Sequence, residues 1–378
     1  MPAEDRARRP RRGQRAAMAR AAHRCAATAL AGLVLLLGAC ASPLSGPDDT
    51  PATSPGPPAA AAPTTTGDAA APEARGQVLA RSARLLVYLP AAGDSLAGMS
   101  RRFLGAPDEG WQIAEANGIA APEAGQPLLV PLQALNPLGV RADRLQLVPI
   151  LCYHRLGGTA SKMSVAPASF EAQMSWLVTN GYRVVRLSDL GEFLAGRKPL
   201  PQRSVVLTFD DGYASFHRFA YPVLKRHGLP ATLFVYTDFV GAGDALSWAQ
   251  LQEMRASGLV DVQSHSKSHR NLVERQPAES EARYLANLDA EMRVSRELLQ
   301  RRLPGLDVRH LAYPFGDADG PVIERARENG YKLAATVVPG GNAFFAAPMM
   351  LRRTMIFGDM RLEGFKARLQ VERLLERP

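Results

Sequence analysis

The sequence has 378 residues, which is too long for one small domain and leaves room for a targeting segment, a small module and a larger domain. With 46% hydrophobic and 21% charged residues, the composition is that of an ordinary globular protein. The formal net charge is +9, but residues 1–39 hold eight arginines and two acids, so the remainder carries only +3. That charge argues against a nucleic-acid-binding surface, and we expect no nucleic-acid partner.

Residues 1–40 have the pattern of an export signal. A basic region is followed by an apolar stretch, residues 25–37, that is too short to span a bilayer as a lasting helix. The Leu-Gly-Ala-Cys sequence that ends at Cys40 resembles a bacterial lipoprotein signal. This resemblance implies lipidation of Cys40 and a membrane anchor in the envelope, and Ser42 favours the outer membrane facing the periplasm. An ordinary cleaved signal is the alternative, and whether translation starts at the first residue or at Met18 stays open.

Residues 41–75 are rich in Pro, Ala, Thr, Gly and Ser and cannot bury a core. We therefore predict a disordered tether without secondary structure. Beyond the signal and the lipid site, Cys152 is the only cysteine, so we expect no disulfide and interpret Cys152 as inert packing in a strand.

Residues 83–133 are predicted to form a small module. Its elements follow the order strand, helix, helix, strand, at residues 85–89, 101–105, 111–117 and 125–131. Three motifs resemble those of the LysM module, namely Gly93-Asp-Ser-Leu96, Asn117-Gly-Ile119 and Gly125-Gln-x-Leu-x-Val-Pro131. The resemblance implies binding of glycans that contain N-acetylglucosamine, typically peptidoglycan, and a degenerate spacer is the alternative.

Strands and helices alternate from residue 145 to residue 372. Strands are expected at residues 147–153, 182–185, 205–207, 231–236, 259–263, 310–313, 332–337 and 351–357. Helices are expected at residues 167–180, 188–195, 214–227, 247–257, 277–302, 320–329 and 361–376. The alternation predicts an α/β fold with a parallel sheet, either a barrel or an open sheet. In both, sites gather at the carboxyl ends of the strands.

Two adjacent acids, Asp210 and Asp211, follow the strand at 205–207 and precede Gly212. Carboxylates at the end of a buried strand are costly unless something compensates them, as a metal ion with a nearby general base would. A solvated strand-end turn is the alternative that this stretch alone leaves open. Because side chains alternate along extended backbone, we expect the two acids to point in different directions.

Two histidines, His265 and His269, follow the strand at 259–263 and are four residues apart. Neutral imidazoles are common ligands of zinc and similar metals. With Asp211 they would supply three protein ligands and leave an open position, as expected of a hydrolytic metal site.

Two motifs resemble those of the NodB-type polysaccharide deacetylases, carbohydrate esterase family 4: Thr208-Phe-Asp-Asp-Gly212 and His265-Ser-x-x-His269. Leu151-Cys-Tyr-His154 resembles the branch that includes poly-N-acetylglucosamine deacetylases. The resemblance covers roughly residues 145–370 and implies a distorted (β/α) barrel that removes acetyl groups from N-acetylated sugars with a divalent metal. By position, Asp210 is then the general base, and the metal ligands are Asp211, His265 and His269. We expect Zn²⁺, with Co²⁺, Ni²⁺ and Fe²⁺ as alternatives.

The sequence departs from the family pattern at the residue that usually orients the base. The third family motif carries an arginine two residues before its proline, but here Ala312 precedes Pro314 in that place. Arg352 or Arg353 could substitute, although both cannot point inward from one strand. We expect Tyr313 and Pro314 to lie at the substrate, with a backbone N–H near Tyr313 binding the oxyanion.

The usual general acid of the family, a histidine in a Leu-x-x-His motif, is also missing. His154 is the best replacement, and a role as a hydrogen-bonded wall residue is equally open. Trp248 could line the sugar site or simply pack in its helix.

The sequence therefore predicts a lipid-anchored envelope protein whose LysM-like module holds a metal-dependent deacetylase near its glycan. The substrate would be poly-N-acetylglucosamine or peptidoglycan. One alternative is a glycan-binding lipoprotein with a vestigial enzyme domain, which the missing arginine keeps open. Another is deacetylation of a different polymer or of a small acylated substrate.

Overall fold

The computed structural model describes residues 74–159 and 161–375. The predicted signal with Cys40, and residues 41–73 of the predicted tether, lie outside the described residues. Within the described ranges, no helix combines the length and the hydropathy needed to cross a membrane.

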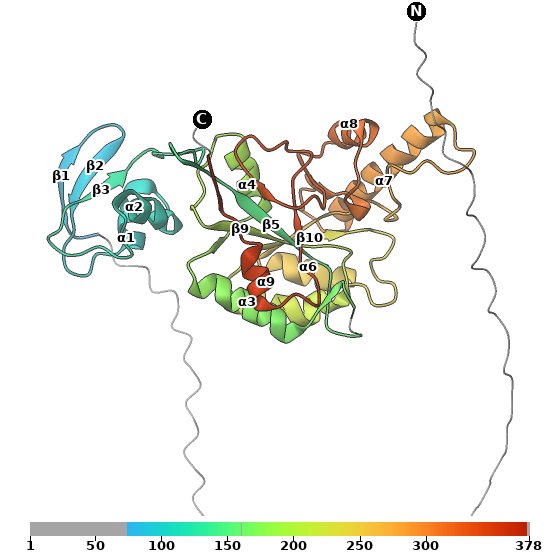
Figure 1. Ribbon diagram of the computed structural model, residues 1–378, viewed down its shortest axis with the longest axis horizontal. Coiled ribbons are helices and arrows are strands. Elements are labelled where there is room, and N and C mark those ends of the chain that lie inside the picture. Colours follow the sequence, from blue (N-terminus) through green and yellow to red (C-terminus); the bar gives the residue numbers. More distant parts are fainter. Residues whose placement is uncertain (1–73, 160, 376–378) are drawn as a thin grey trace, which may run out of the picture. The chain divides into compact units, whose positions relative to one another are not determined.

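A small module with its own core occupies residues 77–131 (Figure 1). Three antiparallel strands pair in the order β1–β2–β3, and the helices lie between β2 and β3 in the chain. Asn117 ties the second helix to β3, because its side chain donates to Leu129 O at 2.7 Å and accepts from Leu129 N at 2.8 Å. The elements are β1 Gln77–Arg81, β2 Leu85–Leu89, α1 Leu96–Leu104, η1 Pro107–Glu109, α2 Gly110–Asn117 and β3 Leu128–Pro131. Strand β1 was not predicted, because most of its residues are exposed and no apolar alternation marks it.

The larger domain is built on a parallel sheet. Its main strands pair in the order β13–β12–β11–β10–β9–β5, and every one of these pairings is parallel. Their bounds are β5 Val148–Tyr153, β9 Ser204–Phe209, β10 Ala231–Val235, β11 Val260–Ser264, β12 His310–Ala312 and β13 Leu333–Ala335. The short β8 (Arg183–Val184) pairs with β9, and β14 (Gly341–Asn342) pairs antiparallel with β5. The predicted α/β class is confirmed.

Residues 351–355 connect the two edges of this sheet. Leu351 forms a parallel bridge with Ala335 at the end of β13, and β15 (Thr354–Met355) pairs with β5. The sheet is therefore curled, as expected for a NodB-type domain, and the strand predicted at 351–357 shrinks to this short connecting segment.

The curled sheet has a separate core on each face, because side chains alternate along its strands. Ile150 and Val206 point to the concave side, where they pack with α4 (Leu187–Leu194) and with residues of β13 at the other edge. Leu151 and Leu207 join the larger core on the convex side. Figure 1 shows α3, α6 and α9 along one side of the sheet. The remaining helices are α3 Pro167–Thr179, η2 Phe216–Ala220, α5 Tyr221–His227, α6 Trp248–Ala256, α7 Glu281–Arg302, η3 Pro314–Gly316, α8 Gly320–Glu328 and α9 Leu362–Ala367.

The C-terminal segment differs from the predicted helix at 361–376. Helix α9 ends at Ala367, and β16 (Glu372–Leu374) then pairs antiparallel with β4 (Arg144–Gln146). Leu147 N also donates to Val371 O at 2.8 Å. These long-range backbone hydrogen bonds outweigh the local helical pattern of the segment.

Candidate active site

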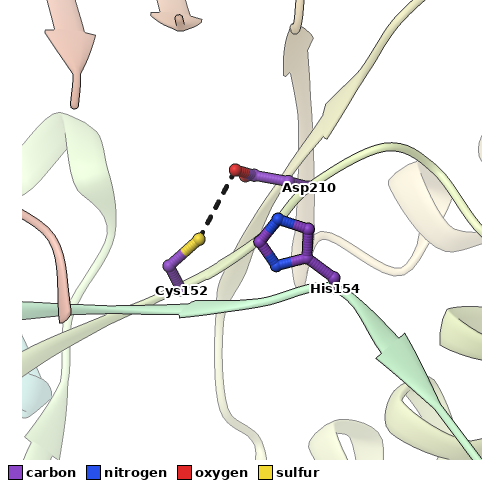
Figure 2. Close-up of side chains that lie close together, drawn as sticks. All are labelled: Cys152, His154 and Asp210. Atoms are coloured by element: carbon purple, nitrogen blue, oxygen red, sulfur yellow. Dashed lines mark hydrogen bonds between the residues drawn. The ribbon is translucent and has the colours of Figure 1, made fainter. Parts of the chain in front are cut away.

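Strands β5 and β9 place the first group of site residues on the concave side of the sheet. Cys152 lies opposite Thr208 in the parallel register. His154 and Asp210 follow two positions later and therefore point to the same side. Figure 2 shows Cys152, His154 and Asp210 facing one another, and one ligand atom from each lies within 4.8 Å of the others.

Asp211 leaves the strand in a left-handed turn. The φ angle is 73° at Asp211 and 88° at Gly212. The expected divergence of the two acids is present, but its cause is this turn and not the alternation of extended backbone. A Cβ atom on Gly212 would lie 2.9 Å from Cγ1 of Val235, so glycine is required there for space as well as for conformation.

The three predicted metal ligands converge on one point. Asp211 Oδ1 lies 3.6 Å from His265 Nε2 and 3.3 Å from His269 Nε2. All three ligand atoms lie within 4.8 Å of one another. His265 and Asp211 are buried, whereas the side chain of His269 is 23% exposed, so the group is reached from its His269 side.

The orientation of both imidazoles is set by neighbouring groups. His265 Nδ1 donates to Ala312 O at 2.7 Å, which leaves Nε2 as the unprotonated nitrogen that faces Asp211. His269 sits at the end of a loop held by the buried carboxylate of Glu291 on α7. That carboxylate accepts from the backbone N–H groups of Lys267 (3.0 Å) and Ser268 (2.8 Å) and from the Ser268 hydroxyl (2.6 Å).

Unusual backbone conformations concentrate at this site. Of the five non-glycine residues with positive φ in the described chain, four lie here, namely Asp211, Ser266, His269 and Phe315. Such conformations cost on the order of 1–3 kcal/mol each and persist only where the surroundings impose them. Phe315 is also 59% exposed, with its ring centroid 4.9 Å from that of His269.

Arg353 is the cation that lies against Asp210. Its Nη1 donates to Asp210 Oδ1 at 2.7 Å, its Nε donates to Thr336 O at 2.8 Å, and its side chain is fully buried. Arg352 points away, with Nη1 3.2 Å from Pro339 O, and is exposed. The structure thus brings Arg353, and not Arg352, to the carboxylate of Asp210.

The charges of the site have clear electrostatic consequences. Burial is the largest single effect on Asp210 and raises its pKa, but the favourable interactions around the carboxylate, of which the charge of Arg353 is the largest, together outweigh burial and hold that pKa well below its usual range. Burial raises the pKa of Asp211 to about 6, and the charge of Asp210 contributes in the same direction. Burial lowers the pKa of His265 to about 3 and also lowers that of His269. Both histidines are therefore neutral at pH 7, as metal ligands must be.

Cys152 contacts the proposed base, Asp210, which the sequence did not indicate. Its Sγ lies 3.4 Å from Asp210 Oδ2, and burial raises the pKa of the thiol well above its usual value. Cys152 is thus a neutral hydrogen-bond donor to the carboxylate and not merely inert packing. An apolar strand context alone contains no signal for this contact.

A cleft of about 360 Å³ opens over these residues. The carboxylates, the two histidines and Arg353 line it together with His154, Arg155, Ser161, Met163, Tyr213, Tyr313, Phe315, Gly316, Val337 and Met355. His154 is therefore in the cleft beside Asp210, where a proton donor could stand. Tyr213 was missed by the sequence analysis, and its side chain interacts with Asp211 in the direction that lowers the pKa of that carboxyl.

Of the three predicted substrate residues, Tyr313 lines the cleft, whereas Pro314 and Trp248 do not. The N–H of Tyr313 donates to Ala335 O at 3.1 Å, so it is not a vacant oxyanion donor, although the ring lines the cleft. Pro314 is buried and does not line the cleft, and proline has no N–H to donate. Trp248 is also absent from the lining, because it packs against the convex core with the Arg302 guanidinium 5.5 Å from its ring centroid.

The residues of the site fit a divalent metal ion. Two neutral imidazoles and one carboxylate are a common ligand set for zinc and similar ions. The hydrogen bond from His265 Nδ1 to Ala312 O is the type of outer contact that aims a ligating nitrogen. Burial raises the pKa of Asp211, and a bound cation would offset this cost of burying the carboxylate.

Comparison with known proteins agrees with this geometry. Residues 197–334 match the polysaccharide deacetylase family model. The solved structure of IcaB from Ammonifex degensii is 30% identical with a TM-score of 0.54, and the match covers 97% of that chain and 60% of this one. This chain belongs to the polysaccharide deacetylase family. The predicted enzyme class is therefore confirmed.

Two curated relatives of this deacetylase are named poly-β-1,6-N-acetyl-D-glucosamine N-deacetylases. The protein from Staphylococcus aureus (strain N315) is 29% identical over 200 residues, which are 50% of this chain and 68% of that protein. The protein from Escherichia coli (strain K12) is 29% identical over 211 residues, which are 47% of this chain but only 31% of that protein. The similarity to the E. coli protein therefore concerns less than a third of its length.

Proposed function

We propose that this deacetylase removes N-acetyl groups from polysaccharides that contain N-acetylglucosamine, with poly-β-1,6-N-acetylglucosamine preferred over peptidoglycan. The observation that carries the proposal is the carboxylate of Asp210, ion-paired with Arg353 at 2.7 Å and adjacent to the convergent group of Asp211, His265 and His269. The similarity to the S. aureus and E. coli enzymes supports the choice of polymer.

The roles of the residues follow from their positions. Asp211, His265 and His269 would hold the metal, for which we propose Zn²⁺, with Co²⁺, Ni²⁺ or Fe²⁺ as alternatives. When bound, the metal supplies Lewis acidity toward the acetyl carbonyl and lowers the pKa of a water. Asp210 Oδ2 lies 3.9 Å from His265 Nε2, so this oxygen is placed to accept the proton of an attacking water.

Arg353 is the positioning residue for that base. It holds Oδ1 of Asp210 and keeps the carboxylate ionised, so that Oδ2 is the oxygen available to the proton. Cys152 donates to Oδ2 from the β5 side and limits its rotation. The ion pair with Arg353 lowers the basicity of Asp210, but it keeps the carboxylate ionised at neutral pH, and only the ionised form can accept a proton.

His154 is proposed as the general acid. It lies beside Asp210 in the cleft and could deliver a proton to the departing amine of the sugar. Near-normal turnover by His154→Ala would exclude this role, and His154→Gln serves as the variant that preserves the hydrogen-bonding capacity of a wall residue.

Acetate release tests the proposed function. Metal content and acetate are measured with N-acetylglucosamine oligomers, both β-1,6-linked and from peptidoglycan, for the wild type and for Asp210→Asn. We expect acetate from the wild type, fastest with the β-1,6-linked oligomers, and loss of about a hundredfold or more in Asp210→Asn, because general-base assistance contributes that much. A metal-loaded wild type that releases no acetate from any N-acetylated substrate would support the vestigial alternative.

The part of the chain that precedes the deacetylase domain is proposed to hold the enzyme at the cell envelope and near its glycan. We propose that residues 83–133 act as a LysM-like glycan-binding module and that Cys40 carries a lipid anchor in the bacterial envelope. The strand and helix order from β2 to β3 and the Asn117 contact with Leu129 support the module assignment. Binding of the full chain to insoluble peptidoglycan, in competition with soluble oligomers, tests it.

A further inference from the structure

A second cavity lies beside the catalytic cleft. It has a volume of about 520 Å³, and Arg155 lines both spaces. Arg155 immediately follows His154, so the second cavity begins one residue beyond the proposed acid. A polymer whose reacting unit occupies the cleft must continue past its rim, and this cavity offers a place for it.

One wall of this cavity is the π-helix η2, Phe216–Ala220. π-helical turns are rare and occur frequently at functional sites. The turn contributes His217, Arg218 and Phe219 to the lining. Gly157, also in the lining, has a φ of 67°, and a Cβ atom there would lie 3.1 Å from Phe219 Cε2. Glycine at this position therefore lets the aromatic ring lie close against the backbone.

Arg155, which lies between the cleft and the second cavity, is fixed by contacts with neighbouring side chains. Arg155 forms an ion pair with Asp244, and its guanidinium lies 4.0 Å from the ring centroid of Tyr213. Ala214 N donates to Asp244 O at 2.7 Å, so the Asp244 loop is fastened to the chain just after the catalytic acids. The cavity thus has a defined position relative to the reacting groups.

The charge of the lining discriminates between the two states of a sugar unit. Two arginines, Arg155 and Arg218, face one carboxylate, Asp244, which already pairs with Arg155. His217 Nε2 is hydrogen-bonded to Glu253 at 3.1 Å. Counting the lining residues alone, two arginines against one carboxylate leave one positive charge, since Glu253 lies outside the lining and its side chain is 59% exposed. A positive lining disfavours the ammonium group of a glucosamine unit and tolerates a neutral N-acetylglucosamine.

We propose that this second cavity binds the sugar unit next to the one being deacetylated, against Phe219, and that it accepts an acetylated neighbour in preference to a deacetylated one. The inference rests on the proposed function, because it names a subsite for the same polymer. An N-acetylglucosamine unit next to a newly formed glucosamine therefore becomes a poorer substrate. It follows that the deacetylated units are separated from one another along the polysaccharide.

Kinetics on defined trimers test the subsite. Acetate release is measured with fully acetylated β-1,6-linked N-acetylglucosamine trimers and with trimers that carry one glucosamine at either end, and hydrolysis of 4-nitrophenyl acetate is the reference. For the wild type we expect kcat/KM about fivefold lower when glucosamine occupies one particular end, as one like charge at a half-exposed site would produce.

Two variants address the two parts of the proposal. Phe219→Ala is expected to lower the ratio of trimer to ester kcat/KM about five- to tenfold through loss of the ring contact. Arg218→Glu, at an exposed position, is expected to reduce the discrimination against glucosamine to less than twofold. Lys225→Glu makes the same charge reversal on the exposed side of α5, away from the cavity, and should match the wild type.

The outcomes distinguish a failure of the proposed subsite from a failure of the proposed function. Wild-type ratios in Phe219→Ala together with unchanged discrimination in Arg218→Glu would overturn the subsite while acetate release leaves the proposed function standing. Equal wild-type rates on all trimers would overturn the charge selection. A wild type that releases no acetate from any of the trimers overturns the proposed function and the subsite with it.

Discussion

Replacing Arg353 with methionine removes the cation that lies against the proposed base, Asp210. Arg353 is fully buried, and its Nη1 lies 2.7 Å from a carboxylate that is itself only 2% exposed. Methionine keeps the packing volume approximately but leaves Asp210 as an uncompensated buried charge. Breaking a buried pair in this way typically costs about 3–5 kcal/mol. For a domain of this size each kcal/mol corresponds to about 2–4 °C, so Tm should fall by roughly 6–20 °C.

The pH dependence gives the sharper measurement. In the wild type the pKa of folded Asp210 lies below its unfolded value, so its stabilising contribution is present above about pH 4 and is lost as pH falls below that. In Arg353→Met, burial instead raises the pKa of Asp210, and its destabilising charge is neutralised as the solution is acidified. The difference in unfolding free energy between the two proteins should therefore be largest near pH 7 and should shrink toward pH 4.

Urea unfolding of metal-free protein at pH 7, 5.5 and 4 measures this difference, and the activity profile of the metal-loaded enzyme accompanies it. We expect the acid limb of the variant's activity to move to higher pH, because the base protonates more easily. Arg352→Met, at the exposed neighbouring residue, is the matched control and should change stability by less than about 0.5 kcal/mol. A variant with wild-type stability and an unshifted acid limb would refute the assignment of Arg353 as the residue that holds the base.

Further predictions concern the metal ligands, the turn and the anchor. Glu291→Gln should weaken metal binding about 10–100-fold by loosening the His269 loop, as measured by competition with a chelator, whereas Glu297→Gln, exposed on the same helix, should not. Because the pKa of Asp211 is raised to about 6, protons should compete with the metal below that pH, and affinity measured by calorimetry should fall between pH 7 and pH 5. Gly212→Ala should cost at least about 1 kcal/mol in urea unfolding, because its φ of 88° is unfavourable for alanine. Cys40→Ala should move the protein from the membrane pellet to the soluble fraction, and an unchanged distribution would contradict the proposed lipidation.

Much of the candidate site was predictable, because its signals are local. Asp210 and Asp211 follow β9 directly, and His265 and His269 lie in the loop that follows β11. Parallel strands bring their carboxyl ends to one edge of the sheet. The position of Arg353 was not predictable to the residue. It depends on residues 351–355 joining both edges of the curled sheet, which is a long-range pairing that no local pattern encodes.

Other differences have the same origin. The contact of Cys152 with Asp210 depends on the register between β5 and β9. Glu291 sits in a long charged helix, where nothing marks one acid as buried until the helix packs against the His269 loop. Trp248 shows the opposite case, in which a residue predicted to be near the site is not there. An aromatic residue at the start of a helix can line a binding site or pack in the core, and Trp248 packs against the convex core.

The distance along the chain between Asp210 and Arg353 has a consequence for the newly made protein. The two residues are 143 positions apart in the chain. Burying Asp210 inside the curled sheet is electrostatically costly until the segment with Arg353 has packed against it. Wherever the chain folds, the catalytic centre can therefore form only together with the C-terminal part of the domain. Any chain cut short before residue 353 lacks a fully formed centre, so completeness of the domain is a precondition for its chemistry.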